Sequence, residues 1–356
     1  MLQTISYGDA VSNDVLALER IIIEMGHDTD IYAEGIDPRI LKQHDILSAI
    51  PLPKLGSEDI LIYHFSIGTE LNHTVTALPC RKIMVYHNVT PPMFFTGYNS
   101  IIRELCARGR KQIFDLAEAF EYCLADSDYN REDLRHIGYT CPINVLPILI
   151  PFDDYAKKPN EKVLENYNDD RTNILFVGRV APHKKIEDVI AAFTNYKKFY
   201  DSNARLFLVG SYEGTETYKK RLDDYIQALG VMDIYITGKI TFDEILAYYK
   251  LANVFLCMSE HEGFCVPLVE AMFFDIPIVA YAATAVPDTL AGSGVLLKEK
   301  NPVLTAGVID RLLHDQQLRD TVIAGQQCRL NDFAYEKVRE LFQTYVMDFI
   351  NWSQPK

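Results

Sequence analysis

The sequence has no C-x-x-C pair, the spacing that most directly indicates a zinc or redox site. Its seven cysteines stand singly at positions 80, 106, 123, 141, 257, 265 and 328, and their number is odd. Scattered cysteines of this kind are typical of reduced thiols that act as small apolar side chains inside cytosolic proteins. We therefore expect free thiols rather than a disulfide framework.

Segments that direct a chain to or across a membrane are also missing. The first residues, MLQTISYGDA, contain neither a basic region nor an apolar core of the signal-peptide type. No apolar run reaches the roughly 18 residues of a transmembrane helix. These features predict a cytoplasmic protein.

Neither half of the chain has an excess of basic residues. The net charge is −14, with 12 Lys+Arg against 22 Asp+Glu up to Asp154, and 23 against 27 beyond it. An acidic balance in both halves argues against nucleic acid as the main partner. Positive side chains in glycine-containing loops are then informative, because an acidic protein that binds anions must concentrate positive charge locally.

The 356 residues favour two domains over one. Apolar runs alternate with amphipathic stretches, which predicts β-α units with parallel sheets. In the first half we predict a helix and five strands, over 13–25 and over 27–33, 59–64, 82–86, 122–125 and 143–149. In the second half we predict five strands, 173–177, 205–209, 234–237, 254–258 and 276–281, and four helices, 186–196, 218–229, 242–251 and 266–274.

The stretch between the two series is polar, rich in Asn and Asp, and without periodicity. We therefore predict a first domain over 1–155, a linker over 156–172, a second domain over 173–333, and a final helix over 334–356 that crosses back onto the first domain. The fold class is α/β with two Rossmann-like parallel-sheet domains facing a cleft. Ligands of such sheets bind outside the carboxyl ends of the strands.

The first chemical motif is Gly178-Arg179, followed by Lys184, between a predicted strand and a helix start. A helix N-terminus favours anions, and a guanidinium and an ammonium beside it suit a diphosphate. Two exposed basic residues on a loop are the alternative interpretation.

The second motif, Glu262-Gly263-Phe264-Cys265 with Glu270, also follows a strand and opens a helix. Backbone N–H groups in this loop can contact a ligand, and both carboxylates can accept hydrogen bonds from the hydroxyls of a sugar or ribose. The alternatives are an acid that complements the helix dipole at Glu262 and a structural acid at Glu270.

Histidines follow two predicted strands of the first half, His64 and His87, and either could be a satisfied core residue instead of a site residue. Gly8, in the first β-α turn, could approach a phosphate closely. Asp126-Ser127-Asp128 matches a metal-binding D-x-D pattern, but it lies where a strand ends and a helix begins. We therefore predict no metal site.

A basic and apolar stretch, 101–114, contains Arg103, Arg108, Arg110 and Lys111, with Phe94 and Phe95 nearby. It could rest on an anionic membrane at the inner face of the plasma membrane or hold a diphosphate-linked acceptor. A solvated helix face is the alternative.

Taken together, these segments resemble the family 4 retaining glycosyltransferases, which have the two-Rossmann-domain fold called GT-B. The resemblance covers nearly the whole chain and is strongest over 173–297. FVGRVAPHKK is similar to the family's phosphate-binding segment, EGFCVPLVE to its E-x7-E motif, and VYHNVTPP to the segment with the catalytic-site histidine. The family usually has glycine where this chain has Lys185, Cys265 and Asp275.

The resemblance implies roles for individual residues. Arg179 and Lys184 would bind the diphosphate, Glu262 and the backbone of Gly263, Phe264 and Cys265 the donor sugar and phosphate, and Glu270 the nucleotide ribose. His87, rather than His64, would be the catalytic-site histidine. Gly8 and Gly178 would line phosphate loops, and Gly210 and Ile240 would lie near the nucleotide.

The implied reaction is metal-independent transfer of a hexose of the mannose or glucose type, with retention, from a GDP- or UDP-sugar. The acceptor would be a saccharide or a polyprenol-diphosphate-linked one in surface polysaccharide synthesis, and no cofactor is required. A sugar-nucleotide epimerase of the same fold and a non-catalytic nucleotide-sugar-binding scaffold remain open. A phosphorylase would need a pyridoxal-phosphate lysine, and no lysine context stands out for it.

Overall fold

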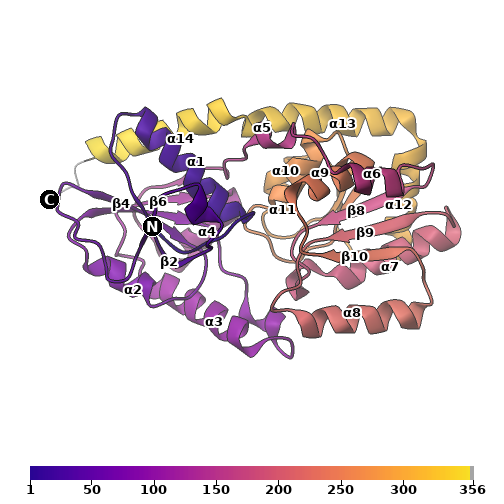
Figure 1. Ribbon diagram of the computed structural model, residues 1–356, viewed down its shortest axis with the longest axis horizontal. Helices are drawn as coiled ribbons and strands as arrows, with labels where there is room; N and C mark the ends of the chain where they lie inside the picture. Colours follow the sequence, from indigo (N-terminus) through magenta and orange to yellow (C-terminus); the bar gives the residue numbers. More distant parts are fainter. Residues whose placement is uncertain (353–356) are drawn as a thin grey trace. The chain divides into compact units, whose positions relative to one another are not determined.

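The computed structural model describes residues 1–352 and divides this part of the chain into two compact α/β units (Figure 1). Unit 1 contains Met1–Pro92, Glu104–Pro151 and the residues from Asp332 onward. Unit 2 contains Met93–Arg103 and Phe152–Asn331. The polypeptide therefore passes from one unit to the other four times, twice more than the predicted linker and returning helix require.

Unit 1 is built on a parallel seven-stranded sheet with the order β3-β2-β1-β4-β5-β6-β7. Its strands are short, apolar and mostly buried, as expected of a parallel sheet covered on both faces. Their bounds are β1 Leu2–Ile5, β2 Ile31–Ile36, β3 Ile46–Ser48, β4 Ile60–Phe65, β5 Arg81–Tyr86, β6 Tyr122–Ala125 and β7 Ile143–Val145. The helices of this part of the chain are α1 Ala10–Glu24, α2 Leu71–Thr74, α3 Ser100–Asp115, whose first turn belongs to unit 2, and α4 Asp128–Ile137.

The long helix α14, Tyr335–Asn351, belongs to unit 1 although it follows unit 2 in the sequence. Val338, Phe342, Val346 and Phe349 recur at helical spacing and are buried. They share one apolar cluster with residues of α1, β5 and β6, including Leu18, Ile83 and Leu124. The core of unit 1 is therefore completed by the end of the described chain.

Unit 2 is built on a parallel six-stranded sheet with the order β10-β9-β8-β11-β12-β13. The strands are β8 Asn173–Val177, β9 Arg205–Val209, β10 Ile234–Gly238, β11 Val254–Cys257, β12 Ile278–Tyr281 and β13 Val295–Leu297. The helices are α5 Phe152–Tyr155, α6 Glu161–Tyr167, α7 Ile186–Phe199, α8 Glu216–Leu229, α9 Phe242–Leu251, α10 Val266–Phe273, α11 Val286–Leu290, α12 Pro302–His314 and α13 Gln316–Leu330. In Figure 1, α7 and α8 lie on one side of strands β8 to β10, and α9 lies on the other.

The segment Met93–Arg103 belongs to unit 2, although the residues on either side of it in the sequence belong to unit 1. The Asn99 side-chain amide donates to the carbonyl of Gly214 over 2.7 Å. The Tyr98 ring stands edge-on to Tyr218, with 5.3 Å between the ring centroids. A piece of the first half of the sequence is thus an integral part of the second unit.

The structure differs from the sequence prediction in the linker. The stretch 156–172 contains α6, which begins after Asn160, whose side chain accepts from the backbone N–H of Val163. Tyr167 at its end packs edge-on against Phe207 and Tyr235. The aromatic contacts of Tyr167 and the cap by Asn160 stabilise a helix in a stretch whose apolar residues do not recur at helical spacing. Sequence reasoning also did not predict β3, β13, α2, α5, α11, α12 and α13.

Candidate functional site

The central strands of unit 2, β8 and β11, form its topological switch point. The chain leaves β8 toward β9 on one side and leaves β11 toward β12 on the other, while β8 and β11 are neighbours. In open parallel sheets the loops that follow two such strands separate and leave a crevice for a ligand. The two predicted motifs, 178–184 and 262–270, begin in these loops.

Lys184 and Glu262 meet at this switch point. The Lys184 ammonium donates to both oxygens of the Glu262 carboxylate, over 2.7 and 2.6 Å. The two side chains are 17% and 6% exposed, so that the pair is largely removed from water. Although burial opposes the charge, the Glu262 carboxylate raises the pKa of Lys184 above its ordinary value. Sequence reasoning gave these residues separate ligands, whereas the structure joins them.

Gly178 and Gly210 bring the loops after β8 and β9 into close contact. A side chain at Gly210 would lie 2.0 Å from the carbonyl oxygen of Gly178, and both glycines have a φ of +147°. The backbone N–H of Gly178 donates to Val209, and that of Val180 donates to Ser211, each over 2.9 Å. Only glycine permits this approach of two backbones. Arg179 between them is exposed, and its guanidinium donates to the Glu213 carbonyl over 2.8 Å.

The loop after β11 leads into α10. Phe264 and Cys265 are buried, and the Thr289 hydroxyl donates to the Phe264 carbonyl. Pro267 lies in the first turn of α10, where its missing N–H costs no helical hydrogen bond. The Glu262 N–H donates to the Thr284 hydroxyl over 2.8 Å, which fixes the start of the loop.

Three of the positions at which this chain departs from the glycines of the family that it resembles share one backbone property. Lys185, Cys265 and Asp275 have φ values of 51°, 76° and 55°, in the left-handed region that favours glycine. The backbone path that glycine would allow is therefore kept, with a side chain added at each point. The departures add side chains to these loops but leave the backbone conformation of the loops unchanged.

Glu270, on α10, is held by two tyrosines. Tyr155 donates to one carboxylate oxygen and Tyr249 to the other. Tyr249 is buried and its ring is stacked on Phe274, with 5.1 Å between the centroids. Burial raises the pKa of Glu270, although both hydrogen bonds act in the opposite direction. No motif spacing indicated these partners, because Tyr155 lies at the edge of the predicted linker and Tyr249 inside a predicted helix.

This raised pKa gives a pH-dependent stability. Above the ordinary pKa of a glutamic acid, the folded protein retains a proton that the unfolded chain has released, so the free energy of unfolding should fall as the pH rises through that window. In Glu270→Gln this part of the slope should vanish. Urea unfolding at several values between about pH 4 and about pH 8 measures it. Glu165→Gln, at an exposed position of α6, is the matched control, and an unchanged slope in Glu270→Gln would contradict the assignment.

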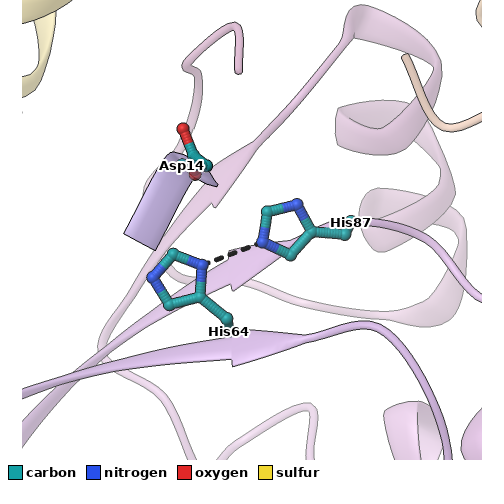
Figure 2. Close-up of side chains that lie close together, drawn as sticks. All are labelled: Asp14, His64 and His87. Atoms are coloured by element: carbon teal, nitrogen blue, oxygen red, sulfur yellow. Dashed lines mark hydrogen bonds between the residues drawn. The ribbon is translucent and has the colours of Figure 1, made fainter. Parts of the chain in front are cut away.

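The two histidines of the first half lie in unit 1, where they form a buried network (Figure 2). His64 Nδ1 is 2.9 Å from His87 Nε2, and His87 Nδ1 is 2.8 Å from the Asp126 carboxylate. The side chains of His87 and Asp126 are 3% and 2% exposed. Although burial opposes protonation, the charge and hydrogen bond of Asp126 raise the pKa of His87, whereas burial lowers the pKa of His64. Both ring nitrogens of His87 are therefore engaged within unit 1.

The two carboxylates of the D-x-D pattern have different partners. Asp126 pairs with His87, while Asp128 is 57% exposed and forms an ion pair with Arg131 one turn along α4. Ser127 between them caps α4 by accepting from the N–H of Asn130. Sequence reasoning missed Asp126 as the partner of His87, although both follow neighbouring parallel strands, β5 and β6.

Gly8 also lies in unit 1, between β1 and α1, with a φ of +77° and open space where a side chain would stand. Ile240 is half-buried in the loop between β10 and α9 of unit 2. Their assignment to the nucleotide stays a prediction.

The basic stretch 101–114 is mostly neutralised in the structure. Arg108 pairs with Glu70, Arg110 with Asp133, and Lys111 with Asp115. Phe95, grouped with this stretch on the sequence, is 4% exposed and packs on His183 of unit 2, with 5.9 Å between the rings. These contacts favour a solvated helix face over a membrane-binding one. Within residues 1–352, no helix combines the length and the apolar composition needed to cross a bilayer.

Comparison with known proteins agrees with this architecture. Residues 157–327 match the model of the family "Glycosyl transferases group 1". The structure of Anabaena HepE in complex with UDP and glucose superposes with a TM-score of 0.78, at 16% identity, over 98% of this chain and 99% of the other. This likeness confirms the predicted fold class.

Two curated relatives are similar in sequence. An uncharacterized glycosyltransferase of Methanocaldococcus jannaschii is 30% identical over 172 residues, 48% of this chain and 43% of the relative. The O-antigen chain mannosyltransferase B of Escherichia coli is 24% identical over 266 residues, 72% of this chain and 67% of the relative. The chain thus spans less than half of the former and about two thirds of the latter. Residues 157–327 are thus similar to the group 1 glycosyltransferases, and the whole described chain has the GT-B fold.

Proposed function

We propose that the chain is a retaining glycosyltransferase that moves a hexose from a UDP- or GDP-sugar to a saccharide or polyprenol-diphosphate-linked acceptor. The observation that carries the proposal is the buried Lys184–Glu262 pair at the switch point between β8 and β11. It places one positive and one negative group where an α/β sheet binds its ligand. A nucleoside-diphosphate sugar offers a diphosphate for the first and hydroxyls for the second.

Donor binding then amounts to an exchange of partners. The diphosphate takes the Lys184 ammonium, and the freed Glu262 carboxylate accepts hydrogen bonds from the sugar hydroxyls. Exposed Arg179 supplies a second cation, and Gly178 and Gly210 let backbone N–H groups approach the phosphates. Because these side chains balance the leaving-group charge, the transfer needs no metal ion on the diphosphate.

The retaining outcome rests on the resemblance to family 4 and on the chemistry of the donor. When the diphosphate leaves, the sugar becomes oxocarbenium-like, and a phosphate oxygen takes the proton of the acceptor hydroxyl on the same face. Lys184 and Arg179 stabilise the charge that grows on the diphosphate. The E. coli relative is named a mannosyltransferase, and the Anabaena structure contains UDP and glucose, which supports a hexose donor without choosing between the two sugars.

Arg179→Ala tests the diphosphate site. Calorimetric titration with UDP, GDP and ADP should show micromolar binding of one nucleotide, unchanged by EDTA and weakened by about 2 kcal/mol in the variant, the scale of a lost charge-assisted hydrogen bond. Arg311→Ala is the matched control, because this arginine is 74% exposed at the end of α12. Failure of all three nucleotides to bind, or binding that requires a metal ion, would contradict the proposal.

Turnover separates an enzyme from a binding scaffold and from an epimerase. Release of UDP or GDP from the matching glucose and mannose donors should be measured with water and with saccharide acceptors. A transferase releases nucleotide and forms an α-linked product that proton NMR identifies. Binding without any release would indicate the scaffold, and a changed sugar still joined to its nucleotide would indicate the epimerase.

A further inference from the structure

Three side chains of unit 1 converge on one buried point. They are Asp14 of α1, His64 of β4 and His87 just after β5 (Figure 2). One ligand atom from each lies within 4.8 Å of the others, and all three residues are buried. The Asp14 side chain is fixed by a hydrogen bond, since one carboxylate oxygen accepts from the Leu149 N–H over 2.9 Å.

The neighbouring contacts orient the histidine rings. Asp126 accepts from His87 Nδ1 over 2.8 Å, which leaves His87 Nε2 on the side of the cluster. His64 Nδ1 lies 2.9 Å from that nitrogen, with the two rings nearly parallel at 12°. This contact is a hydrogen bond, so one of the two nitrogens carries a proton, which a metal ion bound by both nitrogens would displace. A carboxylate behind a histidine is the outer contact that metal-binding histidines generally have.

Charges of both signs act on the cluster. Asp126 and Asp9 act on His87, Asp126 acts on Asp14, and the α-amino group of Met1 acts on His64. That amino group donates to the Ile62 carbonyl over 2.7 Å. Two buried carboxylates, Asp14 and Asp126, beside two imidazoles offer the oxygen and nitrogen ligands that divalent transition-metal ions take.

A second group of possible metal ligands lies in unit 2, but it already pairs with a cation. Cys257, Glu262 and Cys265 also lie within reach of one another. Both oxygens of Glu262 accept from the Lys184 ammonium, so a metal ion would have to displace a buried cation there, but only a proton in unit 1. The cluster in unit 1 is therefore the better site for a metal ion.

We propose that Asp14, His64 and His87 form a binding site for a divalent transition-metal ion, foremost Zn²⁺, with Asp126 as the outer carboxylate. Zinc takes nitrogen and carboxylate ligands at about 2.0–2.2 Å in a tetrahedron, so that its two nitrogens stand about 3.3 Å apart. The histidine nitrogens need to separate by only a few tenths of an ångström from their present distance. A water molecule completes the fourth position, and the ion ties α1 to the two central strands β4 and β5.

Titration with Co²⁺ tests the site, because cobalt replaces zinc and its visible absorption reports the coordination. The full-length protein is first stripped with a chelator that is then removed. One equivalent of Co²⁺ should bind with the strong absorption of a four-coordinate ion, and Zn²⁺ should abolish the signal. In Asp14→Asn and His64→Gln the affinity should fall at least about 100-fold, and in Asp126→Asn about 10- to 100-fold.

Two controls locate the bound ion at this cluster. Cys257→Ser should leave Co²⁺ binding unchanged, and far-ultraviolet circular dichroism should show that the variants are folded. Absence of a four-coordinate signal in the folded wild-type protein would overturn the proposal, as would binding that survives His64→Gln or disappears in Cys257→Ser. Nucleotide binding by unit 2 in the presence of EDTA is a separate measurement, so failure here leaves the proposed reaction untouched.

Discussion

Replacing Lys184 by methionine should destabilise unit 2 by about 3–5 kcal/mol and remove nucleotide-diphosphate binding. Methionine keeps much of the aliphatic stem but leaves the Glu262 carboxylate, which is 6% exposed, without its cation. Loss of one partner of a buried ion pair has this cost, since the remaining charge is neither hydrated nor paired. Urea unfolding measures the first effect, and calorimetry with the nucleotide that the wild-type protein binds measures the second.

The double variant Lys184→Met/Glu262→Gln distinguishes the two effects. It contains no unpaired charge at this position, so most of the lost stability should return, whereas nucleotide binding should stay absent. The cycle of Lys184→Met, Glu262→Gln and the double variant gives the coupling energy of the pair. Equal stability of Lys184→Met and the double variant would show that the pair is not made. Wild-type affinity for the nucleotide in Lys184→Met would refute the diphosphate role.

Replacing Phe342 by alanine should destabilise unit 1 by about 3–5 kcal/mol. Phe342 is 0% exposed and lies in the cluster that joins α14 to β5 and β6. Removal of a buried phenyl ring loses its transfer free energy and leaves a cavity that the surrounding strands fill only in part. The chain has a single tryptophan, and Trp352 packs against this same cluster. Urea unfolding followed by tryptophan fluorescence therefore reports on α14 and its contacts.

Two further substitutions serve as controls for Phe342→Ala. Phe342→Leu retains most of the volume and should cost less than about 1.5 kcal/mol. Phe114→Ala, at a position 54% exposed in α3, should change the stability by less than about 0.5 kcal/mol. A similar, small effect of all three substitutions would show that α14 is not part of the core of unit 1.

The buried strands were the part of the fold that sequence reasoning predicted best. The bounds of β6, β8 and β9 agree with the prediction residue for residue, as do those of α9. Buried parallel strands are continuous apolar runs between turns, so the signal is local. β3 and β13 are only three residues long, too short for any period, and α6 is stabilised by aromatic contacts with strands far along the chain.

Sequence reasoning could predict only those site residues that directly follow a predicted strand. Gly178, Lys184 and Glu262 follow β8 and β11, and the parallel topology alone brings those loops together. Hydrogen-bond partners that are far apart in the sequence could not be predicted, because no motif spacing connects Tyr155 with Glu270 or His87 with Asp126. The prediction of no metal site considered only ligand spacing along the chain, and it stays a prediction. Asp14, His64 and His87 are 50 and 23 residues apart, and only the sheet makes them neighbours.

The order in which the segments of the two units follow one another in the sequence affects folding during synthesis on the ribosome. Domains generally fold as units as they emerge, the earlier one first. Here unit 2 has all of its residues once Asn331 has emerged, because Met93–Arg103 is made beforehand. Unit 1 must wait for Val338, Phe342 and Phe349, which arrive later still. The unit that is translated first is thus completed last, and the apolar face of its sheet stays without α14 throughout the translation of unit 2.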